Sequence, residues 1–245
     1  MKYRPLLHSR AAKRAKIVAI LGMHRSGTSW LAGALQESGL ELGDVNTDAP
    51  NNTKGNREHN KIRTIHEGVL RENGGSWRNP PATVTWSRMR REQLHDVIEE
   101  MSTATQLWGF KDPRTLLVLD EWHKQARNFV AVGIYRHPAA VVRSLRARHE
   151  DFTEDDALDL WNAYNEQLLA EHARRAFPLI RFDVAPERLE TELASIRSYL
   201  GVGDPSAGDD FFDRSLVHNT DDPPVPDRVA DVWRELERLT LALTA

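Results

Sequence analysis

The sequence has no cysteine among its 245 residues. This absence excludes disulfide bonds, thiolate nucleophiles and zinc sites built on sulfur, and it fits a reducing compartment, so we expect a cytoplasmic protein. No apolar run approaches the roughly 20 residues that a membrane-spanning helix needs, so no membrane association is expected. The net charge of −3 gives no overall positive field, which argues against nucleic acid as a partner.

The composition of the chain nevertheless supports one sizeable hydrophobic core, with 40% hydrophobic residues. Residues 1–16 carry six lysine or arginine residues and no acid, and the apolar run that follows is short and lacks a small-residue cleavage site. We therefore expect a flexible basic leader over residues 1–15, followed by a single domain over residues 16–245.

Short apolar runs alternate with helical patterns along the chain. Strands are expected at residues 16–22, 107–111, 129–136 and 178–183, and helices at residues 28–38, 57–72, 88–101, 153–176, 186–200 and 227–243. Continuous rather than alternating apolar runs are typical of parallel strands that are covered on both faces. The alternation predicts an α/β fold in which helices flank a doubly wound parallel sheet, with the long polar loops on the substrate side.

One loop has the form of a phosphate-binding loop but lacks its lysine. Residues 22–29 read GMHRSGTS, which keeps the glycine spacing of such loops and places Thr28 where lysine should stand. Backbone N–H groups and the start of the following helix can still hold an anion, and Arg25 adds a fixed cation inside the loop. The loop therefore predicts a site for a phosphate-like group without the usual triphosphate geometry. Its candidate ligand-binding residues are His24, Arg25, Ser26, Gly27, Thr28 and Ser29.

The longer segment GMHRSGTSWLAGAL resembles the 5′-phosphosulfate loop of sulfotransferases that use 3′-phosphoadenosine 5′-phosphosulfate (PAPS). The resemblance implies the sulfotransferase variant of the P-loop kinase fold and a sulfuryl transfer that releases adenosine 3′,5′-bisphosphate (PAP). The acceptor would be a hydroxyl or amine of a small molecule, glycan or peptide. No metal is expected, because Arg25 and other fixed cations would replace Mg²⁺.

Two further segments resemble the part of this family that holds the nucleotide. The segment IYRHPAAVVRSL matches the 3′-phosphate element through Arg136 at a strand end and Ser144 on the next helix. Phe182 stands where the family has a tyrosine that meets adenine, so stacking is expected without the hydroxyl. The late Arg-Lys-Gly segment of cytosolic members is absent, and Arg214 is the candidate substitute on the 3′-phosphate.

Besides Arg25, the catalytic residues implied by the resemblance are Lys111 and Glu58, which lie in two other stretches. GFKDPRTLLVLDEW is similar to a Lys-Asp-Pro-Arg segment in which Lys111 would stabilise charge on the sulfuryl group. Glu58, in NNTKGNREH, matches a glutamate proposed as general base in relatives, with His59 and His24 as competing bases. The substrate-binding candidates are Trp77, Pro81, Arg114 and His59. The simpler alternatives are a first-turn helix glutamate for Glu58 and a helix-capping charge cluster around Arg114.

Two other functions stay open from the sequence. A phosphotransferase of P-loop kinase topology is one, although Thr28 replaces its lysine and no convincing acidic magnesium-binding strand end is present. A non-catalytic nucleotide-binding module that keeps the fold is the other. Lys111 and Glu58 favour the enzyme, so the sequence predicts a PAPS-dependent sulfotransferase.

Overall fold

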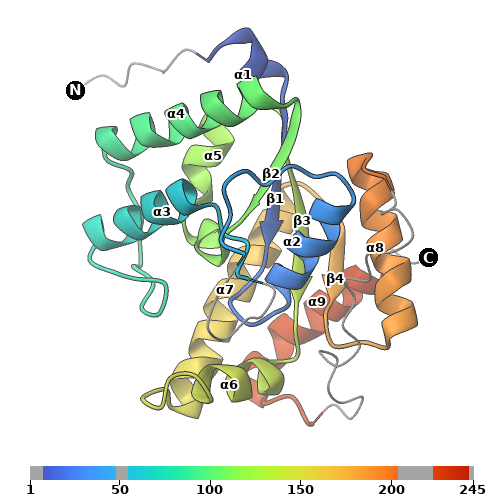
Figure 1. The fold of residues 1–245 in the computed structure, drawn as a ribbon. Helices are drawn as coiled ribbons and strands as arrows, with labels where there is room; N and C mark the ends of the chain where they lie inside the picture. Colours follow the sequence, from blue (N-terminus) through green and yellow to red (C-terminus); the bar gives the residue numbers. More distant parts are fainter. Residues whose placement is uncertain (1–7, 48–54, 204–222, 243–245) are drawn as a thin grey trace. The chain divides into compact units, whose positions relative to one another are not determined.

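The computed structural model of the chain describes residues 8–47, 55–203 and 223–242 (Figure 1). The contacts group the chain into two compact units. The first comprises Met1–Ala19 and Leu40–Val130, and the second Ile20–Gly39 and Ala131–Ala245. The prediction of a single domain over residues 16–245 stays a prediction.

Among the described residues the sheet has four strands in the order β2-β1-β3-β4, so β1 lies beside β3 although β2 comes between them in the sequence, as in a doubly wound sheet. Strands β3 and β4 pair in parallel, with Gly133 opposite Leu179 and Tyr135 opposite Arg181. This arrangement confirms the predicted α/β fold with a doubly wound parallel sheet. The strands are β1 (Lys16–Leu21), β2 (Leu107–Lys111), β3 (Phe129–Tyr135) and β4 (Leu179–Arg181).

Strand β4 is shorter than the predicted range of residues 178–183. One backbone hydrogen bond to β3 follows it, from the N–H of Phe182 to the carbonyl of Tyr135 at 2.9 Å. Beyond this bond, the carboxylate of Asp183 accepts hydrogen bonds from the backbone N–H of His137 at 3.0 Å and from Nε of Arg181 at 2.9 Å.

The first unit packs its helices around an aromatic core. Phe110 and Trp122 stack with ring centroids 4.1 Å apart, and Trp108 lies against both. The helices of this unit are α1 (Arg10–Arg14), α3 (Asn60–Glu72), α4 (Arg88–Ala104), the short 3₁₀ helix η1 (Pro113–Leu117) and α5 (Leu119–Gln125). Helix α1 lies beside α4 (Figure 1), so part of the leader expected to be flexible forms a helix, which begins after the N-cap Ser9.

Helix α3 begins three residues later than predicted. Arg57 has a φ of 52°, in the left-handed region that an L-residue avoids inside a helix, and His59 is the N-cap of α3 in an extended conformation. Glu58 therefore lies in the segment before α3, which is bonded to Asn46 through the backbone, and not in the first turn of the helix.

The second unit is organised around the long helix α7. Its start is fixed by a capping box between Thr153 and Asp156, and its predicted stripe of Leu158, Trp161, Tyr164 and Leu168 is buried, which confirms that prediction. The helices of this unit are α2 (Thr28–Glu37), α6 (Pro138–Arg146), α7 (Glu154–Arg174), α8 (Pro186–Leu200), the 3₁₀ helix η3 (Asp227–Val229) and α9 (Ala230–Ala242). None of the helices in the described ranges is long and apolar enough to cross a membrane.

Candidate functional site

The glycine loop of the second unit leaves the start of helix α2 without a side-chain cap. Gly27 is the N-cap, with a φ of 90°, and it makes no side-chain hydrogen bond to the first turn. A Cβ at this position would lie 2.4 Å from the ring of Phe182, so both the backbone conformation and the close packing require glycine. The first N–H groups of α2 therefore have no capping side chain and can bind an anion.

The loop also contains a buried hydroxyl with no hydrogen-bond partner. Ser26 is fully buried, and within the described part of the chain its Oγ makes no hydrogen bond. Buried polar atoms are nearly always satisfied in folded proteins, so such an atom in a loop of this form is a sign of a missing ligand.

Arg25 is the charged centre of this loop. It has a φ of 70°, and its Nε donates a hydrogen bond to Oγ of Ser144 at 2.7 Å. Burial, followed by the repulsion of the guanidinium groups of Arg148 and Arg136, lowers the pKa of Arg25 to about 10. Among the described residues no carboxylate forms an ion pair with Arg25. The loop thus concentrates positive charge that an anionic ligand would neutralise.

Arg136 lies against the same loop. Its Nη1 donates to the backbone carbonyl of Arg25 at 3.4 Å, and its Nε lies 4.0 Å from the carboxylate of Asp183. Burial lowers the pKa of Arg136, although Asp183 acts in the opposite direction. The guanidinium also lies 5.4 Å from the ring centroid of Phe182, a cation–π distance. The predicted nucleotide residues Arg25, Arg136, Ser144 and Phe182 are therefore close neighbours in one unit.

The hydroxyl of Ser144 accepts its hydrogen bond from Nε of Arg25 at 2.7 Å. The assignment of Ser144 and Arg136 to a 3′-phosphate stays a prediction. Phe182 is buried between the loop and Trp30, with 7% of its surface exposed. Its role in stacking on adenine stays a prediction.

In the first unit, Lys111 and Glu58 form a buried ion pair. Nζ of Lys111 donates to Oε1 of Glu58 at 2.9 Å, and Nη1 of Arg114 lies 3.5 Å from the other carboxylate oxygen. The side chain of Lys111 is 2% exposed and that of Glu58 is 12% exposed. Burial lowers the pKa of Lys111, while Glu58 and Asp112 favour its charged form. The carboxylate of Glu58 thus lies between two cations.

Asp112 binds Arg114, one of the two cations beside Glu58. Its Oδ1 accepts from Nη1 of Arg114 at 2.7 Å and from the backbone N–H of the same residue at 3.1 Å, which caps η1. Burial opposes ionisation, but the guanidinium of Arg114 and the hydrogen bond from His66 together hold the pKa of Asp112 well below its usual range. Asp112 therefore holds Arg114 in place beside Glu58.

His66 completes this cluster and was not singled out by the sequence analysis. Nε1 of Trp122 donates to Nε2 of His66 at 2.9 Å, and Nδ1 of His66 lies 2.8 Å from Oδ2 of Asp112. Since the indole N–H can only donate, Nε2 must be unprotonated and Nδ1 carries the proton that Asp112 accepts. Its spacing in the sequence could have identified His66 as a buried residue, because it lies on the apolar stripe of α3, four residues after Ile62 and three before Val69.

The remaining predicted residues lie in or beside these loops, or in the loop after α3. His59 is 5% exposed, and burial lowers its pKa. His24 packs edge-on to Tyr164 with ring centroids 5.9 Å apart. Thr28 is buried in the first turn of α2 and Ser29 is half-buried, as are Trp77 and Pro81 in the loop after α3. Arg214 lies outside the described residues.

The comparisons with known proteins place the fold. No family model matches the chain, and no curated protein matches it. Among solved structures, the sulfotransferase domain of the olefin synthase from Synechococcus PCC 7002 matches with a TM-score of 0.54 and 19% sequence identity, over 99% of this chain and 97% of that chain. The sulfotransferase STF1 from Mycobacterium tuberculosis matches with a TM-score of 0.48 and 14% identity, over 93% of this chain and 77% of that chain.

The first of these matches covers nearly the whole length of both chains. The chain therefore has the fold of a sulfotransferase domain, as the resemblance of its loop segment implies.

Proposed function

We propose that this protein transfers a sulfuryl group from PAPS to a hydroxyl or amine acceptor. The observation that carries the proposal is the charge at the glycine loop. Arg25 is desolvated beside two other guanidinium groups and has no carboxylate partner among the described residues. An arrangement of this kind is costly unless an anion binds to it. The sulfotransferase fold supports a nucleotide that carries a 5′-phosphosulfate as this anion.

The residues of the loop fit such a donor. The unpartnered hydroxyl of Ser26 and the uncapped N–H groups of α2 supply hydrogen-bond donors, and Gly27 supplies close backbone approach. Arg25, oriented by Ser144, is assigned to the 5′-phosphosulfate, and Arg136 to the 3′-phosphate. A triphosphate is a poorer fit because Thr28 replaces the lysine that binds β- and γ-phosphates.

The ion pair of the other unit supplies the acid–base chemistry in this proposal. The acceptor oxygen or nitrogen forms a bond to sulfur, the bond from sulfur to the bridging phosphate oxygen breaks, and the acceptor proton passes to Glu58. Once Glu58 is protonated, Lys111 loses the negative charge that lies 2.9 Å from its Nζ. Its positive charge is then free to stabilise negative charge that develops on an oxygen atom in the reaction. Catalysis of this kind depends on positioning and charge stabilisation.

Calorimetric titration tests the donor assignment. PAP should bind the full-length protein at least about tenfold more tightly than ADP or AMP in the absence of Mg²⁺, because only PAP offers a 3′-phosphate to Arg136. Equal affinity for AMP would contradict the 3′-phosphate assignment. Transfer of label from radioactive PAPS to a panel of hydroxyl and amine acceptors then separates an enzyme from a binding module, which would bind PAP without transfer.

A further inference from the structure

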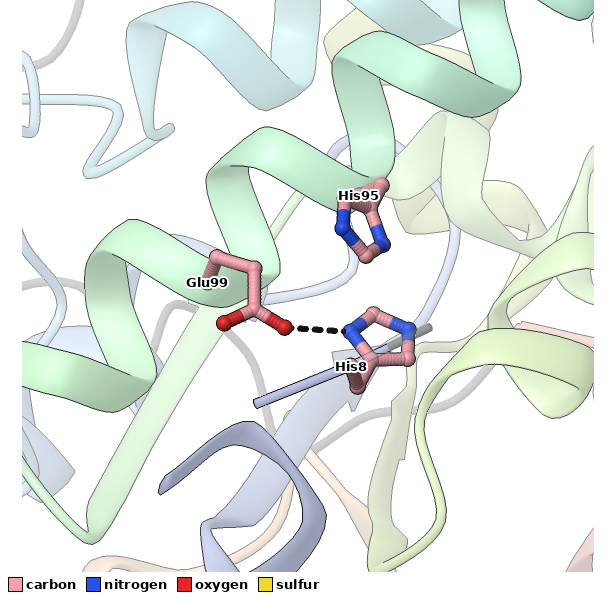
Figure 2. A group of neighbouring side chains, drawn as sticks. All are labelled: His8, His95 and Glu99. Atoms are coloured by element: carbon pink, nitrogen blue, oxygen red, sulfur yellow. Dashed lines mark hydrogen bonds and ion pairs between the residues drawn. The ribbon is translucent and has the colours of Figure 1, made fainter. Parts of the chain in front are cut away.

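A second group of metal-binding side chains lies in the first unit, apart from the Glu58 cluster. Figure 2 shows His95 and Glu99 projecting from α4 toward His8, which precedes α1. His95 and Glu99 are four residues apart, so they share one face of the helix. One ligand atom from each of the three residues lies within 4.8 Å of the other two.

The spacing of these atoms is close to that of a metal site. Nδ1 of His8 lies 2.9 Å from Oε1 of Glu99, and the two imidazole rings have centroids 4.4 Å apart. Two ligands bound tetrahedrally at zinc distances are about 3.3 Å apart. One pair is therefore already close to ligand spacing, and no separation has to close by more than about 1.5 Å, which small changes of side-chain torsion in half-buried residues can supply.

Two imidazole nitrogens in this group lack partners. Nε2 of His8 and Nδ1 of His95 are buried, and neither makes a hydrogen bond with any described residue. Each ring therefore keeps a buried nitrogen that the protein itself does not satisfy. A cation bound to Nδ1 of His95 would satisfy that nitrogen, while His8 would bind through Nδ1, the ring nitrogen that faces Glu99.

We propose that His8, His95 and Glu99 form a binding site for a transition-metal cation, with Zn²⁺ the best match. Two imidazoles and one carboxylate are a known zinc donor set, in which water occupies the fourth position. Ca²⁺ and Mg²⁺ favour sites made entirely of oxygen and are poor matches. Because the site joins the segment before α1 to α4, a bound ion would fix that segment on the first unit and leave one coordination position open to water.

Calorimetry on tag-free, chelator-treated full-length protein tests this site with Zn²⁺ alone. We expect one ion per chain and a rise in the unfolding temperature that Mg²⁺ does not reproduce. His8→Gln and His95→Gln should each weaken Zn²⁺ binding by at least about tenfold. The control is Glu100→Gln, one residue further along α4, whose carboxylate pairs with Lys61 and which should bind Zn²⁺ as the unmodified protein does.

A second measurement is independent of the stability of the variants. Co²⁺ bound to the unmodified protein should give the intense visible absorption of tetrahedral coordination, and excess Zn²⁺ should abolish it. Unchanged Zn²⁺ affinity in His95→Gln would overturn the proposal, as would a Co²⁺ spectrum of weak octahedral type or no heat of Zn²⁺ binding.

Discussion

The two candidate clusters handle charge in opposite ways. In the first unit, Lys111 and Arg114 are matched by Glu58 and Asp112, and all four side chains are largely buried. In the second unit, the charged groups that shift the pKa of Arg25 are the guanidinium groups of Arg148 and Arg136. No carboxylate among the described residues pairs with it. The first cluster is electrostatically complete, whereas the second becomes complete only with a negative ligand.

Because of this difference, the first cluster should contribute mainly to protein stability and the second mainly to ligand affinity. Breaking a complete buried cluster leaves an uncompensated charge in the protein and lowers the free energy of unfolding. Removing a cation from the incomplete cluster relieves repulsion in the free protein and costs affinity for the anion instead. Substitutions in the first cluster should therefore change turnover or folding, and substitutions in the second cluster should change ligand binding.

The largest expected effect is on turnover, from Glu58→Gln. Glutamine keeps the size of the side chain and can still accept from Nζ of Lys111, but it cannot take up a proton. Under the proposed function, kcat should fall by roughly 10²–10⁴-fold while PAP affinity stays near that of the unmodified protein. Steady-state kinetics with PAPS and calorimetry with PAP measure the two quantities.

His59→Asn is the control for this substitution. His59 is buried at the start of α3, so the variant should lose some stability but little turnover. The opposite result, with turnover lost in His59→Asn and kept in Glu58→Gln, would move the role of base to the histidine.

The next largest effect is on folding, from Asp112→Asn. The change removes the carboxylate that holds Arg114 and accepts from His66, and it should lower the free energy of unfolding by about 3–5 kcal/mol at pH 7. Denaturant unfolding measures this loss. Asp96→Asn on the exposed face of α4 is the matched control and should change stability by less than about 0.5 kcal/mol.

The loss in Asp112→Asn should depend on pH in a defined direction. The folded state holds the pKa of Asp112 below its unfolded value, which is about 3.9. Its stabilising contribution is therefore fully present above that pH and declines as the pH falls toward the folded pKa. The stability difference between the unmodified protein and Asp112→Asn should narrow below about pH 4, and a difference that grew there would contradict this assignment.

The sequence predicted the fold and the loop because both depend on local patterns. The strand ranges follow from continuous apolar runs, and β2 and α8 begin and end at the predicted residues. The proximity of Arg25, Arg136 and Phe182 could be predicted because the three segments that carry them resemble parts of the nucleotide site of one family. These features need no knowledge of side-chain packing.

Contacts between distant residues could not be predicted in the same way. The hydrogen bond from Arg25 to Ser144 spans 119 residues, and it depends on the left-handed conformation of Arg25. The hydrogen bonds that link Trp122, His66 and Asp112 depend on how α3 packs. From the sequence alone, His66 therefore cannot be told from any other histidine on an apolar helix face. Periodicity locates such a residue in the core but does not identify its partner.

In the incomplete cluster, Arg136→Ala should have the larger effect on binding. It removes a charge-assisted contact to the proposed 3′-phosphate, so PAP should bind more weakly by roughly 2–3 kcal/mol while the protein stays folded. Arg146→Ala, at the exposed end of α6, is the matched control and should leave PAP affinity unchanged. Unchanged affinity in a folded Arg136→Ala protein would transfer the 3′-phosphate to another residue, with Arg214 the first to test.

The smallest expected effect comes from Ser144→Ala. The hydroxyl accepts the only hydrogen bond from Nε of Arg25 that the described residues provide, so its loss lets the guanidinium leave the orientation suited to an anion. PAP affinity should fall by about 1 kcal/mol, which is roughly fivefold, and the loss should be nearly absent when Arg25 is already replaced by alanine. Calorimetry on Ser144→Ala, Arg25→Ala and the double variant measures this coupling, and Ser195→Ala on the exposed face of α8 is the control. If the losses in the two single variants simply add in the double variant, Ser144 contacts the ligand itself, as the sequence analysis expected; if they do not add, Ser144 acts by positioning Arg25.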